Sequence, residues 1–169
     1  MQVTTTTLEA QPFFKGMSEP MLEMLAKEAM AVEFKAGELI FNEGGLANRL
    51  YLLLSGKVAL ELPTDLEHEP VSIETLGAGS VLGWSWLFPP YYWHFDARAI
   101  TPVKAVFFYG TRLREQCETN HELGYELMKR VSGVVIERLQ ATRRRLAEHH
   151  DAMFAGGLKL PKNLCATSS

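Results

Sequence analysis

The residues best placed to do chemistry lie in one segment, 82–96, which is crowded with aromatic rings. Residues 84–95 hold three Trp, two Tyr and two Phe, and the polar side chains among and beside these rings include Ser85, His94 and Asp96. Because each large ring buries about 150–250 Å², the rings could fill a cavity. They could also form a pocket for a flat or apolar ligand, or an exposed patch for a protein partner.

Two other clusters hold residues that bind metals in many proteins. Cys117 and His121 are four positions apart, and His149, His150 and Asp151 are contiguous. A metal site needs three or four converging ligands, so neither cluster predicts one. No Ser–His–Asp arrangement, P-loop or paired acidic motif stands out. The sequence therefore predicts no catalytic residue and no metal site, and we expect the chain not to be an enzyme.

Composition places the chain among ordinary globular proteins. Of its 169 residues, 47% are hydrophobic and 22% are charged, and the net charge of −3 gives no electrostatic footprint for DNA or an anionic membrane. The two cysteines are far apart in the sequence, which favours a reducing cytoplasm. No apolar run approaches the roughly 18 residues of a membrane span. A cytoplasmic protein without membrane attachment is expected.

The chain ends differ in composition from the rest. Residues 1–11 are rich in threonine and lack the basic start and apolar run of a signal peptide. Residues 152–169 contain Gly156, Gly157 and Pro161. We expect a single domain over residues 12–151, with mobile tails over 1–11 and 152–169.

The first half of this domain changes period from helical to β. Ser18 can cap a helix whose apolar side would hold Met21, Leu22, Leu25 and Met30. Short apolar runs broken by glycine then extend to about residue 109, with strands expected at 57–62, 71–75 and 105–109. Short strands at close spacing indicate an α+β protein built on an antiparallel β-barrel or jelly roll.

A long amphipathic helix is expected to follow, from 121 to about 149. Residues 119–122 match a capping box, in which Thr119 and Glu122 would satisfy each other's amides. One side of the helix is apolar, and we expect it to form a parallel homodimer. The alternative is that this side folds back on its own β-structure. The expected contact residues are Leu123, Leu127, Val131, Val134, Val135, Leu139 and Thr142.

Four segments resemble, in order, a known family. They are 34–37 (Phe-Lys-Ala-Gly), 40–44 (Ile-Phe-Asn-Glu-Gly), 50–56 (Leu-Tyr-Leu-Leu-Leu-Ser-Gly) and 76–83 (Leu-Gly-Ala-Gly-Ser-Val-Leu-Gly). Together with the long helix, they resemble the cyclic-nucleotide-binding domain of the catabolite-activator and protein-kinase-regulatory families. The resemblance covers about residues 13–149, and the alternative is an unrelated small barrel.

The resemblance implies a ligand site in a phosphate-binding cassette that begins at Gly83. In the family a Glu after this glycine binds the ribose hydroxyl, and an Arg nine residues later pairs with the cyclic phosphate. A gapless alignment places Trp84 at the Glu and Trp93 at the Arg, which implies that the usual contacts are lost. Arg98 matches an ordinary strand residue. The cassette implied here comprises Leu82, Gly83, Trp84, Ser85, Trp86, Leu87, Trp93, His94, Phe95 and Asp96.

The resemblance implies a non-enzymatic regulatory or sensory module that does not hold cAMP or cGMP by the usual contacts. One alternative is an interaction or structural subunit with a filled pocket, and another is a true cyclic-nucleotide receptor with divergent contacts. Some relatives bind haem, for which His94 is the one candidate, and we predict no cofactor. The DNA-binding members carry a helix-turn-helix domain after the long helix. About twenty residues follow His149 here, so a regulated protein partner is expected rather than DNA.

Overall fold

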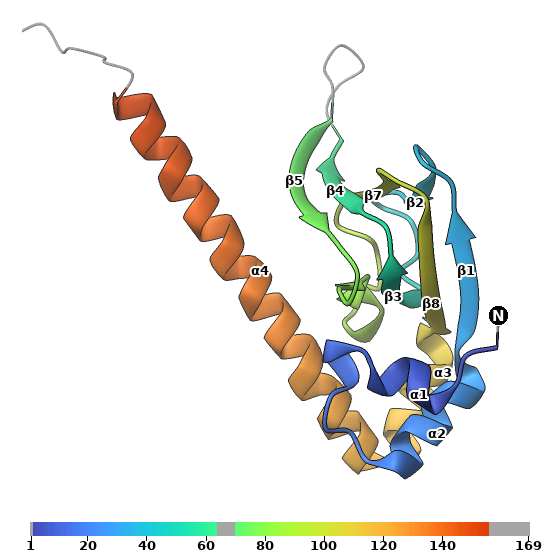
Figure 1. Cartoon of the computed structure of the whole chain (residues 1–169). Coiled ribbons are helices and arrows are strands. Elements are labelled where there is room, and N and C mark those ends of the chain that lie inside the picture. The colour runs from blue at the N-terminus through green and yellow to red at the C-terminus, as the bar shows by residue number, and fades with distance from the viewer. Residues whose placement is uncertain (1, 64–69, 156–169) are drawn as a thin grey trace, which may run out of the picture. The chain divides into compact units, whose positions relative to one another are not determined.

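The computed structural model describes residues 2–63 and 70–155. The chain, drawn in Figure 1, divides into two compact units. The first unit ends at Ser132, and the second begins at Gly133. Within the described residues, no helix is both long enough and apolar enough to cross a membrane.

The first unit is built on two antiparallel four-stranded sheets. One sheet has the order β1-β8-β3-β6 and the other β2-β7-β4-β5. Eight strands in two such sheets form the expected jelly roll. The alternative of a closed barrel was wrong, because the strands divide between two separate sheets. The strands are β1 Met30–Phe34, β2 Leu39–Phe41, β3 Arg49–Ser55, β4 Val58–Leu62, β5 Val71–Leu76, β6 Val81–Leu82, β7 Asp96–Ala99 and β8 Val103–Tyr109.

The main core lies where inward-facing residues of both sheets meet. Tyr51 of β3 lies opposite Phe107 of β8 and Leu82 of β6. These residues belong to one buried cluster with Phe41 of β2 and Leu60 of β4. Alternate residues of a strand face opposite sides of its sheet, and Tyr51 and Leu53 of β3 both point into this core.

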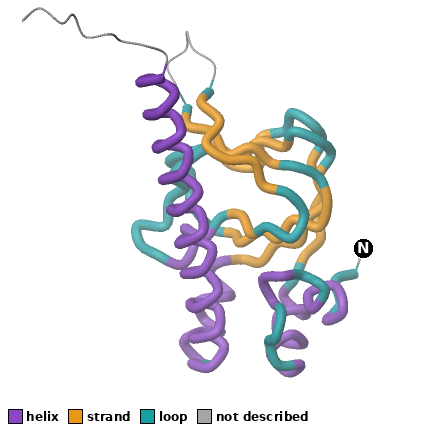
Figure 2. The backbone as a smooth tube through the Cα atoms, turned by 60° about the vertical axis from the view of Figure 1, so that its left-hand side comes forward, coloured by secondary structure: helices purple, strands orange, loops and turns teal. Residues whose placement is uncertain are grey.

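Three short helices precede β1. They are α1 Thr5–Glu9, the 3₁₀ helix η1 Pro12–Phe14 and α2 Glu19–Glu28. Figures 1 and 2 show α1 and α2 at one end of the strands. The prediction of a mobile tail over residues 1–11 was wrong. Thr4 caps α1, and Leu8 of α1 is fully buried. In α2, Met21, Leu22 and Leu25 are buried as expected.

Two details of the expected α2 differ. Met30 does not belong to the helix, because it begins β1 and is 46% exposed. Ser18 occupies the N-cap position, but its side chain makes no capping hydrogen bond.

Two helices follow β8. The sequence pattern did not predict the first of them, α3, which covers Gly110–Thr119. The long helix that was expected is α4, which covers His121–Ala155. The expected capping box was wrong. Asn120 is the cap, because its Oδ1 accepts a hydrogen bond from the Leu123 amide at 3.1 Å, whereas Thr119 donates back to Glu115 and Gln116 of α3. Residues 152–155, expected as tail, continue α4; the rest of that tail, 156–169, lies outside the described residues.

The expected dimer stripe divides into two parts. Leu123, Leu127 and Val131 are at most 1% exposed within the single chain. They are therefore not free to meet a second copy, and the contact assigned to them was wrong. In the second unit, Leu139 is 59% exposed, and Thr142 is also exposed. Val134 and Val135 are half-buried.

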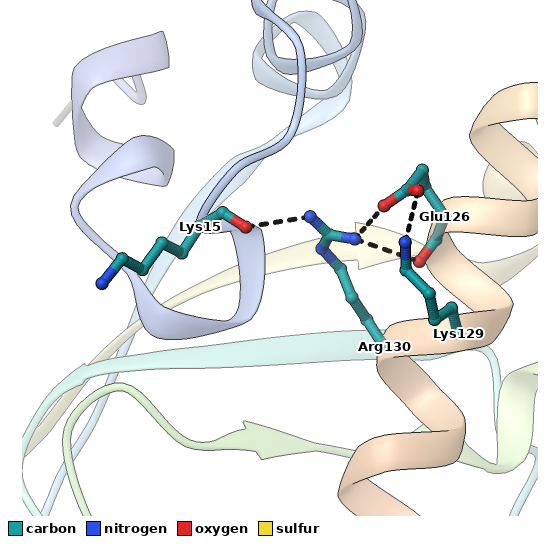
Figure 3. Close-up of polar contacts among 4 residues, drawn as sticks. All are labelled: Lys15, Glu126, Lys129 and Arg130. Carbon is teal, nitrogen blue, oxygen red and sulfur yellow. Dashed lines mark hydrogen bonds and ion pairs between the residues drawn. The ribbon is translucent and has the colours of Figure 1, made fainter.

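A polar network fastens the start of α4 to the N-terminal segment (Figure 3). Arg130 Nη2 donates to the Lys15 carbonyl at 3.0 Å, and Arg130 Nη1 pairs with the Glu126 carboxylate. Lys129 Nζ reaches the other Glu126 oxygen at 2.6 Å. Arg130 is only 12% exposed along its side chain, and its hydrogen bond to the exposed Lys15 connects these two segments.

Candidate functional site

The cassette begins with a sharp turn at Gly83, directly after β6. Gly83 has a φ of 87°, in the left-handed region that glycine adopts without penalty. A Cβ at this position would lie 2.8 Å from two ring carbons of Trp93 and 3.0 Å from the Arg49 carbonyl. Both the backbone angle and the close packing therefore require glycine. The 3₁₀ helix η2, Trp84–Leu87, follows at once.

Trp93 points into the core of the jelly roll. It is 5% exposed, and its ring stacks on Phe41 with centroids 3.9 Å apart and planes inclined by 13°. Its ring also covers Gly83, and its Cδ1 lies beside Gly45. Its backbone amide donates to the Gly45 carbonyl at 2.9 Å. A large apolar ring thus occupies the position at which the resemblance places the phosphate-binding arginine.

Trp86 is fully buried against the junction of β8 and α3. A Cβ on Gly110 would lie 2.8 Å from the Trp86 Cβ, so Gly110 leaves the space that the tryptophan needs. Arg114 of α3 donates to the Trp86 carbonyl at 2.5 Å, and its guanidinium lies 4.4 Å from the Tyr91 ring centroid. Arg114 therefore connects both η2, through Trp86, and the Tyr91 ring to α3. Sequence reasoning missed it because no cassette motif includes α3.

The remaining members of the cassette differ in their exposure. Trp84 is half-buried, and its ring lies 6.0 Å from the ring of His94, which is exposed. Ser85 is buried, and neither its Oγ nor the indole nitrogens of Trp84 and Trp86 have a hydrogen-bond partner. Leu82 is buried, whereas Leu87 and Phe95 are half-buried.

Two charged residues at the end of the cassette are held by the sheets. Asp96 Oδ1 accepts a hydrogen bond from the Glu43 amide at 2.7 Å. Arg98 is the strand residue expected, in β7, but its head group is not simply in water. It pairs with Glu61 at 3.1 Å and donates to the Gly37 carbonyl at 3.2 Å. Arg98 is therefore engaged by groups of the chain itself.

Among the described residues, no group of three His, Cys, Asp or Glu side chains could hold a metal ion. Burial raises the pKa of the Cys117 thiol, with a further contribution from Glu118, so the thiolate that binds metals is disfavoured. The side chains of His149, His150 and Asp151 lie outside the described residues.

Comparison with known proteins agrees with this geometry. The family profile described as the cyclic nucleotide-binding domain matches residues 31–120, which span β1 to the end of α3 and include the whole cassette. This chain belongs to the cyclic nucleotide-binding domain family. The jelly roll, the glycine turn before η2 and the helices after β8 are thus those of a regulatory domain fold.

Individual relatives support the same assignment. A CRP-like cAMP-activated global transcriptional regulator of Mycobacterium tuberculosis is 28% identical over 135 residues, which are 80% of this chain and 58% of that protein. The chain therefore spans little more than half the length of this curated relative. A putative cyclic nucleotide-binding protein from Geobacter metallireducens is 33% identical with a TM-score of 0.74, over 81% of this chain and 98% of that one.

A more distant structure shares the fold alone. The regulatory subunit of a cAMP-independent protein kinase A from Trypanosoma brucei is 20% identical with a TM-score of 0.62, over 83% of this chain and 48% of that one. The presence of this fold therefore does not establish which ligand a chain binds.

Proposed function

We propose that this domain is a non-enzymatic regulatory module whose cassette does not hold cAMP or cGMP by the family's usual contacts. Its ligand, if it is a sensor, differs from a cyclic nucleotide in its recognition chemistry. Its output is the control of a separate protein.

Trp93 is the observation that carries this proposal. A cyclic phosphate needs a cation or several donors beside it, because a buried anion without compensation costs several kcal/mol. The side chain at position 93 is an apolar ring stacked on Phe41, and Arg98 is engaged by Glu61. Trp84, at the position of the ribose-binding carboxylate, offers a donor rather than an acceptor.

The cassette backbone supports a modified site rather than an unrelated turn. Gly83 keeps the left-handed conformation, and a short helix follows it directly. Such a helix presents backbone amides that can bind an anion. Gly83 and η2 therefore support a cassette that differs from the family's in its side chains.

Native mass spectrometry of the purified chain tests the proposal. We expect no co-purified cyclic nucleotide and a stoichiometric adduct of another small molecule. A stoichiometric cyclic nucleotide would overturn the proposal. A stable protein partner without any small molecule would support the second candidate, an interaction subunit, which the full burial of Trp86 favours.

We also propose that the domain acts as a parallel homodimer through the second unit. Positions 135, 139, 142 and 146 of α4 recur at steps of four and three residues, the spacing of a coiled-coil seam. Leu139 is 59% and Leu146 is 70% exposed in the single chain. A second copy of the same helix would cover this row.

A further inference from the structure

Arg49 places a cation on the inner face of a sheet, next to the beginning of the cassette. It is the first residue of β3, the strand between β8 and β6. Its neighbour across the strands is Tyr109, and its carbonyl lies against Gly83. Because residues two apart share a face of the sheet, the Arg49 side chain lies on the same side as the core residue Tyr51.

Aromatic rings, rather than acids, surround this guanidinium. It lies 4.7 Å from the ring centroid of Phe107 and 5.6 Å from that of Tyr109. Its Nη1 is 3.4 Å from the Tyr51 hydroxyl, a long hydrogen bond. That hydrogen bond is the main cause of the raised pKa of Arg49, so the group is a permanent cation.

Much of the donor capacity of Arg49 is unused. A guanidinium has five N–H donors, and Arg49 Nε is buried without a hydrogen-bond partner. Within residues 2–63 and 70–155, no carboxylate forms an ion pair with it. Arg98 and Arg130, in contrast, are paired with Glu61 and Glu126. A half-buried cation without an acidic partner favours an anion from outside the chain.

The site is open on one side. Tyr109 is 41% exposed, and Arg49 itself is half-buried. A ligand could therefore reach the guanidinium past the Tyr109 ring without displacing Trp93 from the core. The ring of Tyr109 offers a flat apolar surface on which a planar group could pack, whereas Phe107, at 7% exposed, supports the guanidinium from the core side.

We propose that Arg49, with the Tyr51 hydroxyl and the ring of Tyr109, binds the oxyanion of a small planar ligand. The recognised group is a carboxylate or a phosphate, held by the fork of the guanidinium. The proposal rests on the proposed function, because it names the chemistry of a ligand for a cassette that has lost its usual contacts.

Titration of the whole chain with three probes tests this site. Benzoate and phenyl phosphate carry the two candidate anions, and benzyl alcohol is the uncharged control. Binding is followed by NMR through the indole N–H signals of the tryptophans, which all lie in the cassette. We expect both anions, or one of them, to bind, and benzyl alcohol to bind at least tenfold more weakly. The anion that binds more tightly shows whether the site recognises a carboxylate or a phosphate.

Substitutions assign the binding to Arg49. Arg49→Met should weaken the binding of the anion at least tenfold, and Arg49→Lys should weaken it because the bidentate fork is lost. Lys104→Met is the matched control, since it removes one positive charge from β8 of the same sheet at a side chain that is 63% exposed. It should change the affinity less than twofold. If Arg49→Met does not fold, the affinity of the Arg49→Lys variant for the anion tests whether Arg49 forms the site.

The site does not exist if neither anion binds, if benzyl alcohol binds as tightly as the anions, or if folded Arg49 variants bind like the unaltered chain. This failure is distinct from failure of the proposed function. A parallel titration with cAMP reports on the cassette. Micromolar cAMP binding that persists in Arg49→Met would contradict the proposed function, whereas absence of both cAMP and anion binding would overturn the Arg49 site alone.

Discussion

At the scale of single residues, the packing of Trp93 determines how the cassette is interpreted. Its ring lies between Phe41 and Gly83, two residues that are far apart in sequence. A tryptophan in such a place contributes to the stability of the core and also excludes a ligand from the same volume. Stability and ligand exclusion should therefore change together when this residue is replaced.

Trp93→Ala should lower the free energy of unfolding by about 3–5 kcal/mol, because it removes a buried ring and leaves a cavity. Urea denaturation followed by circular dichroism measures the change. The neighbouring Tyr92→Ala is the control, since Tyr92 is 44% exposed, and surface substitutions usually change stability within about 0.5 kcal/mol. Equal losses for the two variants would show that Trp93 is not packed as described.

The sequence predicted a set of cassette residues but not all of the contacts that those residues make. Positions 84 and 93 could be assigned because the glycine turns fix the alignment. The stacking of Trp93 on Phe41 and the tie from Arg114 to Trp86 could not be predicted, because both depend on contacts between distant strands and helices. The role of Arg49 was missed for the same reason, since its environment is made by β8.

At the scale of elements, the join between the N-terminal segment and α4 depends on one arginine. Arg130→Met should destabilise the chain more than Lys129→Met does, because the Lys15 carbonyl and the Glu126 carboxylate both lose a charged donor. Hydrogen exchange should become faster over residues 12–17. Lys129→Met is the control, because its pair with Glu126 is 53% exposed on the lysine side and such pairs contribute about 0–1 kcal/mol. Unchanged exchange in Arg130→Met would contradict this assignment.

The same network should make stability depend on pH. The hydrogen bond from Lys129, followed by Arg130, lowers the pKa of Glu126 in the folded chain. The folded state therefore favours the ionised carboxylate, so this contribution is complete above about pH 4.3, the ordinary Glu value, and is lost as the pH falls through the folded pKa.

Glu126→Gln tests that dependence. The stability difference between the unaltered chain and this variant should be largest near neutral pH and should shrink in acid. Urea denaturation at several pH values measures it. A difference that is constant with pH would show that the carboxylate charge makes no contribution.

Local sequence signals predicted the type of most elements better than their ends. The strands from 57 to 62 and from 71 to 75 were placed almost as found, because their periodicity of two is strong. The α1 helix was missed because its threonine-rich sequence favours helix only weakly and its one buried residue, Leu8, is held by tertiary packing. Asn120 and Thr119 are both good caps, so the sequence alone could not choose between them.

At the scale of the whole molecule, the second unit should determine the oligomeric state. Leu139→Glu should give monomers, because it places a charge in the proposed seam. Analytical ultracentrifugation measures the mass, and Gln140→Glu on a neighbouring face of the helix is the control. Val131→Glu is unsuitable for this test, since Val131 is fully buried and a charge there would destabilise the chain. A monomeric unaltered chain would contradict the dimer.

Isothermal titration of the unaltered chain with cAMP and cGMP tests the central claim most directly. The account predicts no binding or dissociation constants in the millimolar range, because the apolar ring of Trp93 occupies the place of the phosphate-binding cation. A folded Trp93→Arg variant should gain affinity for the cyclic nucleotides over the unaltered chain. A micromolar constant for the unaltered chain, which corresponds to about −8 kcal/mol, would contradict the account.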